Sequence, residues 1–174
     1  MIYAGTAYAP GSWLSRVIAW FQLLAHPTAQ PLSHAFFLLK DPIFGWEVLG
    51  AEARGFYPMI ATSWAPSYVV DLFEVPGLEV ALAKNKAALG APYDFPGLVG
   101  MTWVEAMWWA FKRRVKNPLS HVGAWFCSAI VAQVLETDGI DCPGEPRSVD
   151  PVTVGATLAA GGFKRANFAE VIAS

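Results

Sequence analysis

The stretch SHAFFLLKDPIFGWEVLGAE, residues 33–52, decides the fold class of this chain. Ser33 to Leu39 and Phe44 to Glu52 are short runs rich in aromatic and branched apolar residues, a composition typical of β-strands. In the first run, alternation puts His34 on the same face as two apolar side chains. The sequence therefore predicts two consecutive strands, with an imidazole at the start of the first.

The segments outside this stretch divide into early strands and later helices. Further strands are expected at 1–5, 55–60 and 67–75, and a last one from Phe163 onward. Helices are expected at 13–25, where Ser12 can cap the first turn, and at 77–89, 96–115, 125–136 and 152–160. This order predicts an α+β fold with an antiparallel sheet. No linker divides residues 1–174, so we expect a single domain.

The composition is strongly apolar for a chain of 174 residues. Hydrophobic residues make up 55% of it, charged residues 15%, and the formal net charge is -2. High hydrophobicity with low charge excludes an intrinsically disordered chain. No excess of Lys and Arg is available for phosphates, so we expect no nucleic-acid partner. The sequence has no run of ~18 uncharged apolar residues and no signal-peptide pattern, which predicts a cytoplasmic or virion-associated protein.

Common catalytic and cofactor motifs are absent from the sequence. It has no GxSxG, no GxxxxGK[ST], no HExxH and no CxxC. Three His and two Cys are too few for a dedicated zinc site, so we expect neither a metal ion nor a cofactor. A nucleophilic cysteine with a distant histidine is compatible with these counts.

Cys127 is the candidate nucleophile because it begins the predicted helix WFCSAIVAQVLE. A thiol in the first turn lies at the positive end of the helix dipole, beside free N–H groups, and both favour the reactive thiolate. Cys127 also shares helical spacing with four apolar residues, which is the pattern of an inert buried cysteine. His34 has the same two interpretations, a base or a core histidine, and either Glu47 or Glu52 on the next strand could orient it.

Six segments, in order along the chain, resemble a known family of hydrolases. They are GTAYAPGSWLSRVIAWFQ (5–22), PLSHAFFLL (31–39), WEVLGAEARGF (46–56), GAPYDFPGL (90–98), WFCSAIVAQVL (125–135) and SVDPVTV (148–154). The ordered set resembles the permuted papain-like cysteine hydrolases, the YiiX-like branch of the NlpC-type cell-wall peptidase superfamily. This resemblance implies a circularly permuted papain-like fold, in which an antiparallel sheet packs against helices and the His strand precedes the Cys helix.

The resemblance also assigns roles to four residues. Cys127 would be the nucleophile, and His34 the general base and later the general acid. Glu52 would hold the second ring nitrogen of His34, and Tyr93 would hydrogen-bond in the active site. Backbone N–H groups, including that of Cys127, would form most of the oxyanion hole. The implied activity is hydrolysis of an amide bond, in a peptide or a peptidoglycan stem, through a thioacyl-enzyme and without a cofactor.

Several residues keep alternatives open. Glu47 competes with Glu52 as the acid, because the family strand usually reads hydrophobic-Glu-Ala, whereas Gly50-Ala51 precedes Glu52 here. His121, six residues before Cys127, is a rival base. His26 has no motif around it. Cys142 is expected to be a loop cysteine, and a disulfide between it and Cys127 is not expected in a reducing cytosol.

Two further functions compete with peptide hydrolysis. Related permuted folds of the lecithin–retinol acyltransferase type handle lipid acyl groups, and eight Trp suit an apolar substrate. The chain could also be a structural or interaction protein on the same scaffold, for instance a phage tail or virion component. Trp103, Trp108 and Trp109 on the 96–115 helix, which ends in a basic tip, would be either core packing or a surface for a protein or lipid partner.

Overall fold

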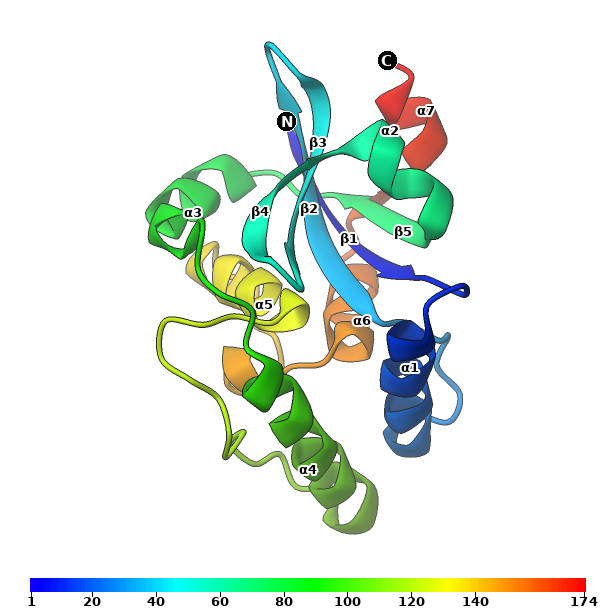
Figure 1. Ribbon diagram of the computed structural model, residues 1–174, viewed down its shortest axis with the longest axis vertical. Helices are drawn as coiled ribbons and strands as arrows, with labels where there is room; N and C mark the ends of the chain where they lie inside the picture. Colours follow the sequence, from blue (N-terminus) through cyan, green and yellow to red (C-terminus); the bar gives the residue numbers. More distant parts are fainter.

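The computed structural model describes residues 1–174 and is an α+β protein, a six-stranded antiparallel open sheet with seven helices (Figure 1). The strands are β1 (Ile2–Tyr8), β2 (His34–Asp41), β3 (Gly45–Glu52), β4 (Gly55–Ile60), β5 (Val69–Glu74) and β6 (Lys164–Ala166). The helices are α1 (Trp13–Ala25), α2 (Ala61–Trp64), α3 (Leu78–Lys84), α4 (Phe95–Phe111), α5 (Cys127–Thr137), α6 (Pro151–Ala160) and α7 (Phe168–Ile172).

The strand order is β4-β3-β2-β1-β5-β6, and every neighbouring pair is antiparallel. β2, β3 and β4 follow one another as a meander, while β1 and β5 extend the sheet on the other side of β2. Phe36 on β2 pairs with Gly50 on β3. This register continues toward the start of β2 and the end of β3, so it places His34 opposite Glu52.

Alternation along the strands gives the sheet two apolar faces, each covered by helices. On one face, Phe37 and Leu49 belong to a large core with buried residues of α3, α5 and α6. On the other face, Phe36 and Leu38 pack in a smaller core with residues of α2 and α7. Figure 1 shows α5 and α3 on one side of the sheet, α2 and α7 on the other, and α1 and α4 beyond one end of its strands.

The sequence accounts for most element boundaries. Ser12 caps α1 by accepting a hydrogen bond from the Ser15 amide, as predicted. Asp94 caps α4 through Gly97, and Asp150 caps α6 through Thr153. Each cap supplies a side-chain acceptor to an N–H group that has no partner inside the helix.

Four expected boundaries were wrong. The strand expected at 1–5 continues to Tyr8. The 96–115 helix ends at Phe111, because Lys112 adopts a left-handed φ of 53°, so three basic residues follow the helix instead of forming its last turn. The 77–89 helix ends at Lys84 and continues only as a 3₁₀ turn. The last strand, β6, is three residues long and is followed by α7, which Asn167 caps. No helix of this fold has the length and apolarity needed to cross a membrane.

Candidate active site

Three of the four residues expected in the site meet near one end of the sheet, and each is held by a different element. His34 is the first residue of β2, Glu52 the last of β3 and Cys127 the first of α5. The Cys127 thiol lies 3.8 Å from the carbonyl oxygen of Ser33, to which it donates. Helix α5 packs on β2, which brings its N-terminus beside the start of that strand.

The His34 ring has both the Cys127 thiol and the Glu52 carboxylate as neighbours. Its Nε2 is 3.5 Å from Oε1 of Glu52 and has no hydrogen-bond partner. Burial of the ring lowers the pKa of His34, but charge and hydrogen bonding from Cys127, followed by the charge of Glu52, outweigh it. The pKa of His34 is therefore raised above its ordinary value of 6.5. This environment favours the protonated form of the ring.

Trp64 and Tyr68 complete the surroundings of Glu52, and the sequence analysis had indicated neither of them. Its Oε1 accepts hydrogen bonds from Nε1 of Trp64 and the hydroxyl of Tyr68, both at 3.2 Å. The rings of Trp64 and Tyr68 also lie against the His34 ring, each with its centroid 5.8 Å away. Burial, and then the Glu52 charge, raises the pKa of Tyr68, so its hydroxyl stays a donor. The carboxylate is thus held in place by two donors while it faces the imidazole.

Gly50 makes room for this arrangement. A Cβ atom at Gly50 would lie 2.9 Å from Nε2 of His34, closer than side chains approach each other in folded proteins. The glycine that interrupts the expected strand pattern therefore lies directly under the ring. Glu52 is two residues further along β3 and so lies on the same face.

Tyr93 lies beside the start of α5. It forms a parallel bridge with Trp125, and the backbone of Pro92 and Asp94 is hydrogen-bonded to Trp125. Burial, and then the charges of Cys127 and Glu52, raises the pKa of Tyr93 well above its usual value. Its phenol is therefore neutral, and it lines a small pocket together with His34 and Glu52.

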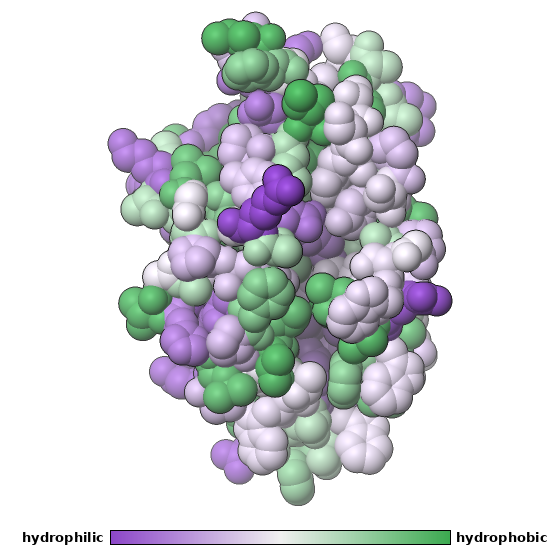
Figure 2. Space-filling view, viewed as in Figure 1, coloured by the Kyte–Doolittle hydropathy of each residue, from purple (hydrophilic) through white to green (hydrophobic).

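Cys127 itself is almost enclosed, with 2% of its surface exposed, and it belongs to the large core. It nevertheless lines an apolar cavity of about 210 Å³ between α1 and α4. Figure 2 shows a furrow in this part of the molecule, with hydrophobic side chains along its walls. Helix α5 has no side-chain cap, so the N–H groups of its first turn are not occupied by one. Such groups can stabilise an oxyanion that forms next to the sulfur.

The other candidates lie elsewhere. Glu47 pairs with Leu39 and Ile60 toward the opposite end of β3, five residues from Glu52. His121 is 63% exposed in a loop, where Nδ1 lies 3.5 Å from Oδ1 of Asp94. Cys142 is buried and is a free thiol like Cys127, and burial raises its pKa to about 11. The structure therefore brings Glu52, and not Glu47, to the ring of His34. His121 pairs with Asp94 instead.

The tryptophans of α4 are only partly covered. Trp103 is 53% exposed and Trp109 is 63% exposed. Trp108 is half-buried, and its ring contacts Lys112, Arg114 and His26. None of the three belongs to a hydrophobic core of the fold.

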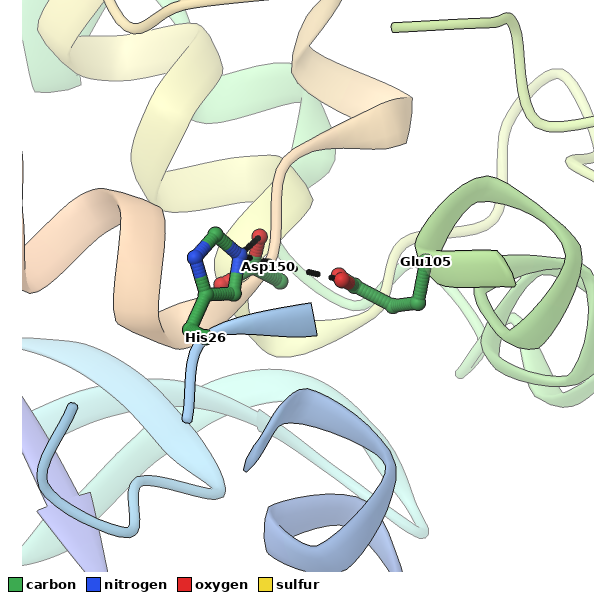
Figure 3. A group of neighbouring side chains, drawn as sticks. All are labelled: His26, Glu105 and Asp150. Atoms are coloured by element: carbon green, nitrogen blue, oxygen red, sulfur yellow. Dashed lines mark ion pairs between the residues drawn. The ribbon is translucent and has the colours of Figure 1, made fainter. Parts of the chain in front are cut away.

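One cluster was missed by the sequence analysis. His26, Glu105 and Asp150 converge from the end of α1, the middle of α4 and the start of α6 (Figure 3). Burial, and then the nearby Asp150, raises the pKa of Glu105 to about 9. Burial also raises the pKa of Asp150, but hydrogen bonding from His26 and Thr153 outweighs it, so that the pKa of Asp150 is lowered. No local motif could reveal residues so far apart in the sequence.

Comparison with protein-family models, with curated proteins and with solved structures finds no match for this chain.

Proposed function

We propose that this chain is a cysteine-dependent amide hydrolase with a circularly permuted papain-like fold of the NlpC type. The observation that carries the proposal is the convergence of Cys127, His34 and Glu52 in the order nucleophile, base and orienting acid. A buried imidazole between a thiol and a carboxylate is the arrangement that nucleophilic catalysis by cysteine requires. The chain order, with the His strand before the Cys helix, supports the permuted form of the fold.

The proposed reaction has two steps. The Cys127 thiolate attacks the carbonyl carbon of an amide bond, and N–H groups at the start of α5 stabilise the oxyanion. The His34 imidazolium then protonates the leaving amine, which gives a thioacyl-enzyme. In the second step His34 takes a proton from water, the hydroxide attacks the thioester, and the thiol leaves. Glu52 keeps the ring oriented throughout and stabilises its charged form.

The experiment is labelling and turnover with an amide-based probe, including peptidoglycan stem peptides. We expect Cys127→Ala and His34→Ala each to abolish labelling while circular dichroism shows a retained fold. Cys142→Ala is the matched control, because it removes the other buried free thiol and should change nothing. Labelling of Cys142 with Cys127 untouched would overturn the proposal.

A second candidate activity is acyl transfer or hydrolysis on a lipid, and the apolar cavity at Cys127 favours it. Its walls include Leu14, Ile18 and Phe21 of α1 and Leu98 and Met101 of α4. Ester probes with acyl chains of increasing length separate the two activities, because only a lipid enzyme gains rate with chain length. A third candidate, a non-catalytic phage tail or virion component, predicts no turnover of either probe and a partner on the Trp-rich face of α4.

A further inference from the structure

The cavity that reaches Cys127 has a second group of titratable side chains on its wall, and this group has no part in the proposed thiol chemistry. Glu105 and Asp150 line the cavity, and His26 lies against both of them. We propose that His26, Glu105 and Asp150 bind a divalent cation with the ligand preference of zinc. The proposal does not depend on the hydrolase activity.

The spacing of the three groups suits a metal ion. Nε2 of His26 is 3.7 Å from Oε2 of Glu105 and 3.6 Å from Oδ2 of Asp150. All three ligand atoms lie within 4.8 Å of one another. Ligands bound tetrahedrally at ~2.1 Å from zinc are about 3.4 Å apart, so small side-chain movements would complete the geometry. Figure 3 shows the three side chains pointing toward one another from separate elements.

The charges also call for a cation. Glu105 is 6% exposed and Asp150 is 3% exposed, so two carboxylates are buried against one imidazole. Buried carboxylates are strongly unfavourable unless they are paired with positive charge or bind a metal. With no cation bound, a proton takes its place, because the pKa of Glu105 is raised to about 9. A divalent cation would displace this proton and balance both carboxylates.

The ligands are already oriented by their neighbours. Asp150 accepts hydrogen bonds from the Thr153 amide at 2.8 Å and from the Thr153 hydroxyl at 2.7 Å. The His26 ring stacks on Trp108, with an interplanar angle of 28°. Outer contacts of this kind fix the direction of metal ligands and raise affinity.

Gln22 provides an independent indication of a ligand. It is 4% exposed, and its Oε1 is buried without a hydrogen-bond partner. Gln22 lines the same cavity as Glu105 and Asp150 and lies one turn before His26 in the chain. A buried amide oxygen without a partner is unfavourable, and a metal ion in this cavity, or the water bound to it, would supply the missing partner. Three protein ligands and an open position toward the cavity are the features of zinc sites that exchange ligands.

The test is metal binding by the purified chain with Cys127→Ala and Cys142→Ala, so that no thiol binds zinc. After EDTA treatment and dialysis, Zn²⁺ is added and followed by calorimetry, with Mg²⁺ and Ca²⁺ as comparison ions. We expect one equivalent of Zn²⁺ to bind and to raise Tm. Co²⁺ in its place should give the intense visible absorption of a four-coordinate site. His26→Ala and Glu105→Gln should each weaken Zn²⁺ binding by ~100-fold or more, and Thr153→Ala by ~10-fold through loss of orientation.

His121→Ala is the matched control, since it removes an exposed histidine that also lies beside an acid, and it should leave binding unchanged. If His26→Ala does not fold, His26→Asn replaces it, with circular dichroism as the check. Two results overturn the proposal. One is no stoichiometric uptake of Zn²⁺ by the parent chain. The other is uptake that is the same in the His26 and Glu105 variants, in which case the cluster is an ion pair held by a protonated His26.

Discussion

Replacing Glu52 by Gln tests the assignment of the orienting acid. Glutamine keeps an acceptor oxygen for Trp64 and Tyr68, so the substitution removes the charge and little else. Because the Glu52 charge contributes to the raised pKa of His34, we expect that pKa to fall in the variant. The pH range in which the His34 ring is charged should then end at a lower pH.

The size of the shift follows from the distance between the two groups. Unit charges 3.5 Å apart attract by about 1 kcal/mol at the dielectric of water and by about 5 kcal/mol at an effective value of ~20. The Glu52 side chain is 27% exposed, which places the pair in the lower half of this range. An energy of about 2 kcal/mol corresponds to about a 30-fold change in the protonation equilibrium of the ring.

The assay is the pH dependence of Cys127 alkylation in a Cys142→Ala background. Iodoacetate is an anion, so its rate rises as the thiolate forms and falls as His34 loses its proton. In Glu52→Gln the alkaline limb should move down by about 1–2 pH units, whereas neutral iodoacetamide should show no such limb. Glu47→Gln, on the same strand, is the matched control and should leave the profile unchanged. Equal shifts in both variants, or none in Glu52→Gln, would refute the reasoning.

The same pair makes stability depend on pH. A histidine whose pKa is raised by folding stabilises the fold fully below its ordinary value of 6.5, and this contribution is lost as pH rises through the raised value. The Tm of the wild type should therefore exceed that of Glu52→Gln most at about pH 5–6. The difference should be smaller in alkaline solution, where the ring is neutral in both proteins.

Three further substitutions probe the supports of the site. Gly50→Ala places a Cβ 2.9 Å from Nε2 of His34. It should lower the free energy of unfolding by about 1–3 kcal/mol and slow alkylation of Cys127. Gly11→Ala is the control, because its Cβ meets nothing within 4 Å, and it should have neither effect. Asn117→Ala removes hydrogen bonds to Gly97 and Arg147, so thermal unfolding should show a loss of about 2–3 kcal/mol, and an unchanged Tm would contradict that. His121→Ala should leave turnover intact, because the ring pairs with Asp94 at the surface; a large loss would make it the base.

The elements that the sequence predicted well have long, regular patterns. β2, β3 and α5 begin and end within two residues of expectation, and the register of β2 with β3 then brings His34 and Glu52 together. Helix α2, which supplies Trp64 to Glu52, was not predicted, and the reason is physical. α2 is four residues long, too short to show helical periodicity, and its Trp64 stabilises the carboxylate through a contact between residues 12 positions apart.

The ambiguity of Cys127 also has a physical basis. Its spacing fits both an inert core cysteine and a nucleophile, and the structure has features of both, since the residue is buried in the large core and yet lines a cavity. What distinguishes the two is the neighbouring ring of His34, which a pattern within α5 cannot encode. The same limit applies to His26, Glu105 and Asp150, which meet only because three helices end or pass at one point.

The exposed Trp residues are concentrated on two helices. Among the largest fully buried side chains, five are Phe and none is Trp. Four of the eight Trp are more than half exposed, and all four lie on the helices that wall the cavity: Trp13, Trp20, Trp103 and Trp109.

The positions of these exposed Trp residues lead to a last prediction. Trp13 lies one turn before Val17, and Trp109 one turn after Glu105, and both Val17 and Glu105 line the cavity. The double variant Trp103→Ser and Trp109→Ser should change the free energy of unfolding by only about 1 kcal/mol, because both side chains are half exposed or more. If the exposed rings extend the apolar wall for a lipid substrate, the double variant should lose turnover of long-chain ester probes and keep that of peptide probes. If the double variant changes turnover of both probes equally, these Trp residues do not determine substrate choice. The exposed face would then be a surface for a partner.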